Sequence, residues 1–86
     1  MPVIATFFGI VIRMYFGDHA PPHFHAEYQG QKATFNLSGE LLTGNMSSRS
    51  ARRLIRDWAV LRRFELMVNW RNIERGRPLN RIAPLD

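Results

Sequence analysis

The amino-acid sequence predicts an α+β fold: an antiparallel β-meander of three to five strands, followed by a long or broken C-terminal α-helix packed on one face. In the first half of the chain, apolar and polar residues alternate between short turns, which is typical of strands with one buried face. In the second half, apolar residues recur at helical spacing. A chain of 86 residues has room for one core, so we expect a single domain, residues 1–86.

The sheet is expected over about residues 3–46, and it begins with its most apolar part. Residues 10–16 are β-branched or aromatic on nearly both faces, which predicts a central strand. Phe7-Phe8-Gly9 predicts an earlier strand that bends or bulges at Gly9. The Pro21-Pro22 pair predicts a loop before about His23, because proline lacks a backbone donor and restricts the residue before it.

A hairpin with a defined register is expected next. Residues 23–28 alternate, Gln29-Gly30 suits a two-residue turn, and residues 31–37 form the returning strand. With that turn, Glu27 lies opposite Lys32, and every other pair joins two residues of similar polarity. One face then enters the core. The other face is a polar strip made of His23, His25, Glu27, Lys32, Thr34 and Asn36.

The last strand, residues 41–46, precedes a helical part expected over about residues 48–75. Ser47 and Ser48 are candidate N-caps for a helix from about Ser48 to Arg62. Beyond it the apolar stripe is rotated by about a quarter turn, which predicts a bend or break near Arg62-Arg63.

Gly76 and Pro78 are expected to end the helical part. The extended tail, residues 76–86, is expected to lie back over the core. The helical spacing also assigns three large side chains to the core, namely Trp58, Met67 and Trp70.

Composition limits the class of protein. The absence of cysteine excludes disulfides and thiolate metal sites, so a metal would need histidine, carboxylate and water, and none is required for folding. The apolar N-terminal segment is interrupted by Arg13 and has no basic leader or cleavage signal. We therefore expect neither a signal peptide nor a membrane span, and a cytoplasmic bacterial-type protein.

The net charge of +5 comes almost entirely from arginine, whose planar fork suits phosphates and carboxylates. Four arginines, Arg49, Arg52, Arg53 and Arg56, recur at helical spacing and form one basic face. They lie at the helix end where the macrodipole disfavours cations, so a compensating anion is expected. Nucleic acid or an acidic cognate protein would satisfy this face, and self-association stays open.

All three histidines fall within residues 19–25, and three interpretations of them stay open. As a metal site, a divalent ion such as Zn²⁺ would be held by candidates among Asp18, His19, His23, His25 and Glu27. As an acid/base site, His19, His23 and His25 with Lys32 or Arg13 would cleave RNA, with or without a metal. As structural residues, His19 would brace the double-proline loop, and His23 and His25 would hydrogen-bond Asn36 and Thr34.

The chain also resembles a known family in a set of short motifs. They are Phe7-Phe8-Gly9-Ile10, Arg13-Met14-Tyr15, Asp18-His19, Pro21-Pro22-His23-Phe24-His25-Ala26, Trp58-Ala59, Asn69-Trp70, Pro78-Leu79, Ile82 and Pro84-Leu85. Together they resemble the bacterial domain of unknown function 4160 family over almost the whole chain. The resemblance implies a small single-domain protein, often encoded beside a family 2442 protein in an arrangement similar to toxin-antitoxin pairs. It supplies no catalytic residues, and Arg62-Arg63-Phe64 departs from members that carry a histidine or acids there.

Charge, histidine clustering and the resemblance lead to one expected function. It is a toxin-antitoxin-like component that binds or acts on nucleic acid through the polar strip and the arginine helix. The alternatives are a non-enzymatic module that binds an acidic protein, with structural histidines, and a histidine/carboxylate metal-binding domain.

Overall fold

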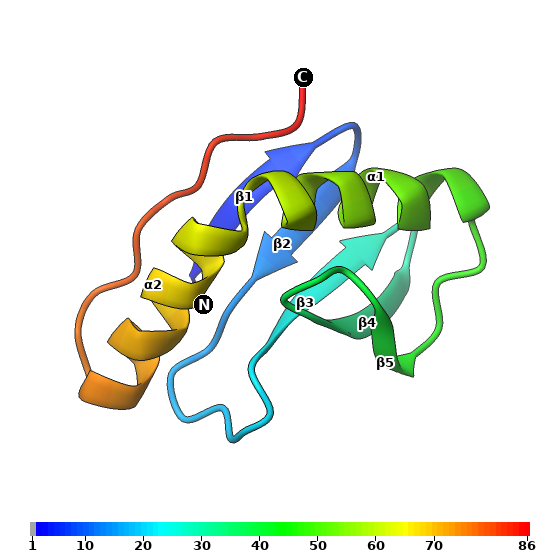
Figure 1. The fold of residues 1–86 in the computed structure, drawn as a ribbon. Coiled ribbons are helices and arrows are strands. Elements are labelled where there is room, and N and C mark those ends of the chain that lie inside the picture. The colour runs from blue at the N-terminus through cyan, green and yellow to red at the C-terminus, as the bar shows by residue number, and fades with distance from the viewer. Residues whose placement is uncertain (1) are drawn as a thin grey trace.

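The computed structural model describes residues 2–86 and confirms the α+β prediction, with a five-stranded antiparallel sheet followed by two helices (Figure 1). The elements are β1 (Val3–Phe7), β2 (Ile10–Arg13), β3 (His23–Tyr28), β4 (Gln31–Asn36), β5 (Leu41–Gly44), α1 (Arg49–Leu61) and α2 (Arg63–Arg75). The strands lie in chain order, so the sheet is a meander, and β1 and β5 are its edges.

The predicted register of the β3–β4 hairpin is confirmed at every pair, from Tyr28 opposite Gln31 to His23 opposite Asn36. The prediction for Gly9 is wrong in detail. Phe8 and Gly9 both have positive φ, 50° and 80°, and form the tight turn between β1 and β2. Two consecutive residues in this conformation match the twist of a two-residue hairpin, and the irregularity of β1 lies between Val3 and Ala5 instead.

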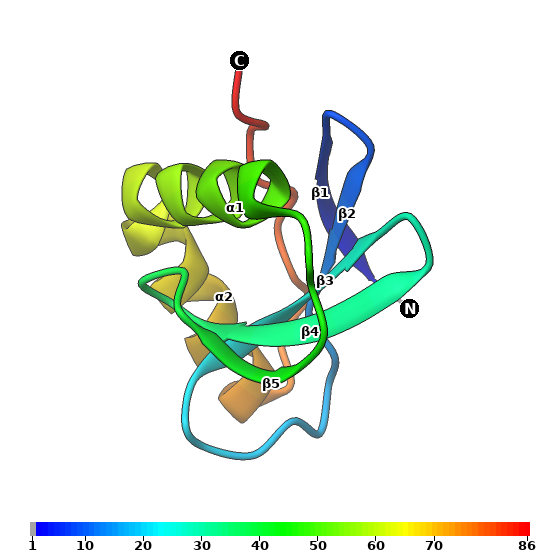
Figure 2. The same cartoon turned by 90° about the vertical axis from the view of Figure 1, so that its right-hand side faces the viewer.

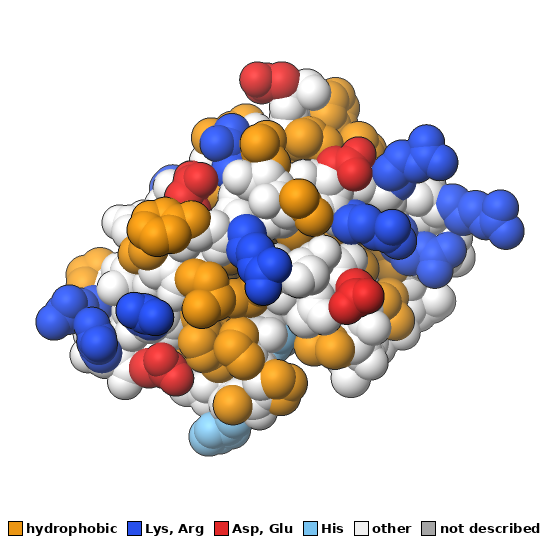
Figure 3. All heavy atoms as spheres, viewed as in Figure 1, with side chains coloured by type: hydrophobic (Ala, Val, Ile, Leu, Met, Phe, Trp, Pro, Cys, Tyr) orange, Lys and Arg blue, Asp and Glu red, His pale blue; other side chains and the backbone are white. Residues whose placement is uncertain are grey.

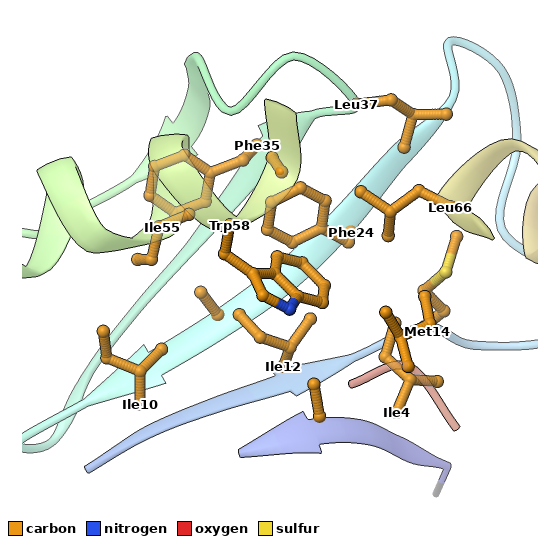
Figure 4. Packing of buried hydrophobic residues seen from close by; sticks show 14 of the residues in the cluster. Ile4, Ile10, Ile12, Met14, Phe24, Phe35, Leu37, Ile55, Trp58 and Leu66 are labelled. Atoms are coloured by element: carbon orange, nitrogen blue, oxygen red, sulfur yellow. The ribbon is translucent and has the colours of Figure 1, made fainter. Parts of the chain in front are cut away.

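Both helices cover one face of the sheet, which curves around them (Figures 1 and 2). Trp58 reaches from α1 into the centre of this core and is fully buried (Figure 4). Its ring centroid lies 5.4 Å from that of Phe7 and 5.6 Å from that of Phe24, the latter in an edge-on arrangement that aromatic rings favour. The core thus joins β1, β3 and α1.

The helical part begins and breaks where the sequence predicts. The Ser48 hydroxyl accepts a hydrogen bond from the Ala51 amide and caps α1. Arg62 separates the helices, with φ −105° and ψ 20°, and Gly76 ends α2 in the left-handed conformation. Neither helix of the described chain has the length and apolar character needed to cross a membrane.

The break at Arg62 reorients α2, whose buried residues are Leu66, Asn69, Trp70 and Ile73. The core position predicted for Trp70 is therefore confirmed. The position predicted for Met67 is wrong, because that residue follows Leu66 around the helix and 37% of it is exposed.

The tail lies over the core, as predicted, with Ile82 buried. Three contacts hold it in place. The indole nitrogen of Trp58 donates to the Ala83 carbonyl at 2.9 Å, and the Ile82 amide donates to the Ile4 carbonyl of β1 at 2.8 Å. The buried Asn69 amide group forms two hydrogen bonds of 2.9 Å with the backbone of Asn80.

Candidate functional site

The loop between β2 and β3 brings an aspartate beside two histidines. Tyr15 and Asp18 bracket a tight turn in which the Asp18 amide donates to the Tyr15 carbonyl at 3.4 Å. Gly17 has φ +88° within this turn, a conformation that glycine adopts without steric cost. The chain thereby reverses, and Asp18 comes to face the first half of β3, which carries His23 and His25.

Asp18, His23 and His25, hereafter the triad, converge on one point. Oδ2 of Asp18 lies 3.4 Å from Nε2 of His23 and 3.3 Å from Nε2 of His25. The three ligand atoms all lie within 4.8 Å of one another. The side chains of Asp18, His23 and His25 are 18%, 15% and 32% exposed, so the point of convergence is partly sheltered and still reachable from solvent.

The tautomer of His23 is fixed by its second ring nitrogen. Nδ1 lies 2.8 Å from the Pro21 carbonyl oxygen, which can only accept, so Nδ1 carries the proton. In the neutral ring, Nε2 then presents a lone pair toward Asp18. A hydrogen bond from the outer ring nitrogen to a backbone carbonyl is the usual support of a metal-ligating histidine.

Aromatic rings pack against both imidazoles. The rings of Tyr15 and His25 are perpendicular, with centroids 4.5 Å apart, and Trp70 of α2 packs on His23 at 5.4 Å. The two imidazoles also lie edge to face at 5.2 Å. Packing of this kind restricts rotation of the ligand side chains, which a preorganised site requires.

The separations suit ligands of a shared metal better than hydrogen bonds. Zinc binds nitrogen and oxygen at about 2.0–2.2 Å, which places neighbouring ligands of a tetrahedral site about 3.4 Å apart. Charge-assisted hydrogen bonds between nitrogen and carboxylate oxygen are about 2.7–2.9 Å long. The distances of 3.3 and 3.4 Å match the first value, so these residues fit a divalent metal ion.

The other candidate residues of the sequence lie outside this point. His19 is exposed and takes no part in the triad. Glu27 forms an ion pair with Arg13, at 2.7 Å, and not with Lys32, although Lys32 is its neighbour across the hairpin as predicted. Arg13 of β2 lies opposite His25 of β3. Glu27, two residues further along β3, is therefore the diagonal neighbour of Arg13.

The hydrogen bonds predicted for structural histidines are not formed in the described part of the chain. The amide group of Asn36 instead donates to Glu40 at 2.9 Å and accepts from the turn after β4. The hydroxyl of Thr34 pairs with that of Thr43 at 2.6 Å. The partners of His23 and His25 are therefore Asp18 and Pro21.

A cavity of about 160 Å³ adjoins the triad on the polar face of the sheet. It is lined by Val11, Arg13, Tyr15, His25, Ala26, Glu27, Lys32, Ala33, Thr34, Thr43 and Gly44. His25 belongs to both the triad and the cavity. Of the candidate acid/base residues, the structure thus brings Arg13, His25 and Lys32 to one place.

The four candidate anion-binding arginines, Arg49, Arg52, Arg53 and Arg56, lie together on the exposed face of α1. They share no lining residue with the cavity beside the triad. In Figures 1 and 2, the start of α1 and the loop that carries Asp18 lie at different ends of the molecule. The two candidate sites are therefore separate.

Sequence reasoning missed three parts of the site. These are the Pro21 carbonyl, the Tyr15 ring and the Trp70 ring. The first two depend on the conformation of an irregular loop, for which periodicity carries no signal. Trp70 was expected in the core, and its ring also lies beside that of His23.

Comparisons with known proteins point to one family. No curated protein matches the chain, and no solved structure matches it. A family model matches residues 9–71, which is more than half of the chain and includes the triad and both helices up to Arg71. The chain therefore belongs to the family described as Domain of unknown function (DUF4160).

Proposed function

We propose that this protein binds a divalent transition-metal ion, such as Zn²⁺, through Asp18, His23 and His25. One observation carries the proposal: a single carboxylate oxygen faces two imidazole nitrogens at 3.3 and 3.4 Å, while the other nitrogen of His23 is engaged by Pro21. A lone pair on Nε2 of His23 and the Asp18 carboxylate repel each other unless a cation, either a proton or a metal ion, lies between them.

The ligand set indicates the kind of metal chemistry. Three protein ligands leave at least one coordination position to water, which is typical of catalytic zinc sites, whereas structural sites use four protein ligands. Two histidines and one carboxylate are also the ligand set of non-haem Fe²⁺ sites, so both metals belong in the test.

Metal titration by calorimetry tests the proposal directly. Protein freed of metal with a chelator is titrated with Zn²⁺ and, without oxygen, with Fe²⁺. We expect one equivalent to bind to the wild type, and His25→Ala to lose this binding. His19→Ala is the matched control, because it removes an exposed histidine outside the triad and should bind like the wild type.

Two results would contradict the proposal: no uptake by the intact protein, or equal uptake by His25→Ala. Loss of folding must be told apart from loss of the site, because Trp70 of the core packs on His23 of the triad. Circular dichroism and the fluorescence of the two buried tryptophans, Trp58 and Trp70, report the fold of each variant.

A second candidate function is metal-assisted cleavage of a phosphodiester, and the cavity beside the triad favours it. Arg13 and Lys32 contribute two cations to this cavity and Glu27 one anion, so an anionic group could bind next to His25. Cleavage of labelled RNA by metal-loaded protein, compared with His25→Ala and Lys32→Gln, tests this candidate. Intact RNA in the wild-type reaction would exclude it.

The toxin-antitoxin-like role, with nucleic acid as target, stays a prediction. Inducible expression of the wild type beside a His23→Ala, His25→Ala double variant tests it, with growth and total RNA followed over time. Equal and harmless behaviour of both proteins would exclude a toxic activity that depends on the triad.

A further inference from the structure

A second surface, unrelated to the triad, lies between α1 and the turn that joins β4 to β5. It is a groove of about 570 Å³, hereafter the basic groove. Its lining consists of Phe35, Gly39, Glu40, Leu41, Arg49, Arg52, Arg53 and Arg56. Figure 3 shows lysine and arginine side chains gathered over the beginning of α1, at the right of the view.

The guanidinium groups of the basic groove are unneutralised. None of its four arginines forms an ion pair with a described residue. The first turn of α1 contains no acid. Glu40 is the one acid in the lining, and its carboxylate accepts a hydrogen bond from Asn36 at 2.9 Å. Asp57, the one acid of α1, lies outside the lining.

The groove has a fixed wall opposite the arginines. Gly39, with φ +84°, lies so close to α1 that a Cβ atom there would come within 2.7 Å of the Arg56 Cα. The Gly39 amide also donates to the Asn36 carbonyl at 2.9 Å, which closes the turn. The turn therefore packs directly on the helix and holds Leu41 and Glu40 at the rim of the groove.

The length of the row of arginines suits the phosphodiester backbone of a nucleic acid. Arg49 and Arg56 are seven residues apart, which corresponds to about 10 Å along a helix. The phosphates of one nucleic-acid strand succeed each other at about 3.4 Å of axial rise, so the row spans about three of them. Guanidinium groups bind phosphate oxygens in a bidentate manner, which favours arginine for this task.

An acidic protein would be expected to use apolar contacts as well. The most exposed apolar side chains of the helices are Val60, Leu61 and Phe64, which lie at the end of α1 and the start of α2, outside the groove. The groove itself offers only Leu41 as an exposed apolar side chain. We propose that the basic groove binds the phosphodiester backbone of nucleic acid, without reading its sequence.

Fluorescence anisotropy with labelled 20-nucleotide single-stranded RNA and a 20-base-pair DNA duplex tests this proposal. Chelator is present throughout, so binding is measured without a metal at the triad. The variant Arg52→Gln, Arg56→Gln removes two charges from the groove. The control Arg71→Gln, Arg75→Gln removes two charges, also of exposed residues, from α2.

We expect the wild type to bind, with an affinity that falls steeply with salt. Each arginine contact adds about 0.9 to the slope of log affinity against log salt on duplex DNA, which is about eightfold in affinity per arginine at 0.1 M salt. The groove variant should therefore bind more than tenfold more weakly, with a slope reduced by up to about 2. The control variant should stay within about threefold of the wild type.

Three results would overturn the proposal. The first is absence of binding to either nucleic acid at 50 mM salt. The second is an equal loss in the groove and control variants, which would assign the binding to net charge alone. The third is binding of a labelled polyglutamate peptide that is lost when Arg52 and Arg56 are replaced, while neither nucleic acid binds.

Discussion

Asp18 presents the same carboxylate oxygen to both His23 and His25, and Nε2 of His25 lies 3.3 Å from it. A metal ion at this point would bind the folded chain preferentially, because folding brings the loop that carries Asp18 against the two histidines of β3. Ligand present at 100 times its dissociation constant stabilises a folded protein by about 2.7 kcal/mol.

Saturating Zn²⁺ is therefore expected to raise the melting temperature by roughly 10–20 °C, since each kcal/mol moves the midpoint of a domain of this size by about 4–8 °C. Differential scanning calorimetry with and without the ion measures the shift. Asp18→Asn keeps the shape of the side chain and removes its charge, and should abolish most of the shift. An equal shift in this variant would mean that the ion binds elsewhere.

Replacement of Gly39 by alanine is expected to destabilise the protein more than replacement of Gly30. Both glycines have positive φ, 84° and 80°, so alanine should cost about 1–2 kcal/mol at either position. At Gly39 the added methyl group would also meet the backbone of Arg56, whereas Gly30 has open space around it. This overpacking should add about 1–3 kcal/mol, measurable by urea denaturation. Equal losses would show that the turn moves freely off α1.

Arg49→Glu is expected to stabilise the fold. Arg49 is the first residue of α1, where the helix macrodipole disfavours a cation and favours an anion. Reversal of the charge should raise the free energy of unfolding by about 1 kcal/mol at low salt. Arg71→Glu makes the same change in net charge inside α2 and should have a smaller effect. Lower stability of the Arg49 variant in urea would refute this argument.

Asn69→Leu is expected to release the tail. The Asn69 side chain is fully buried, and its two hydrogen bonds satisfy the amide and the carbonyl of Asn80. Leucine keeps the volume but leaves both backbone groups unpaired, at a cost of about 1–3 kcal/mol for each one that stays buried. Faster hydrogen exchange at the Asn80 amide would report the release.

Asn80→Ala is the control for this prediction, because the two bonds use only the backbone of that residue. Its exchange rate and stability should stay near those of the wild type. If both variants exchange alike, the side chain of Asn69 does not hold the tail.

The sheet could be predicted where local chemistry is decisive. Gln29-Gly30 sets a two-residue turn, and a slip of one residue would expose Phe24 and Phe35, so the β3–β4 register follows from the sequence. No comparable signal fixes β2 against β3, because a nine-residue loop, residues 14–22, joins them. For this reason the ion pair between Glu27 and Arg13 could not be predicted.

The candidate site shows the same division. Alternation along β3 places His23 and His25 on one side of the sheet, which sequence reasoning can use. The position of Asp18 depends on the turn at Gly17 and on the fold of the whole loop. The sequence could therefore name Asp18 only as one of several candidate ligands. Met67 was misplaced because the buried face of α2 includes the polar Asn69, which moves the centre of that face away from Met67.

The hydrogen bond between Ile82 and Ile4 has a consequence for assembly. It places the tail beside β1, one of the two edges of the sheet, whereas β5 at the other edge is exposed along its whole length. Open edges are the places where strands of another chain can be added. A sheet with one blunted edge can be extended in one direction only. Strand addition between copies of this chain would therefore end with a closed pair and would not propagate into a fibre.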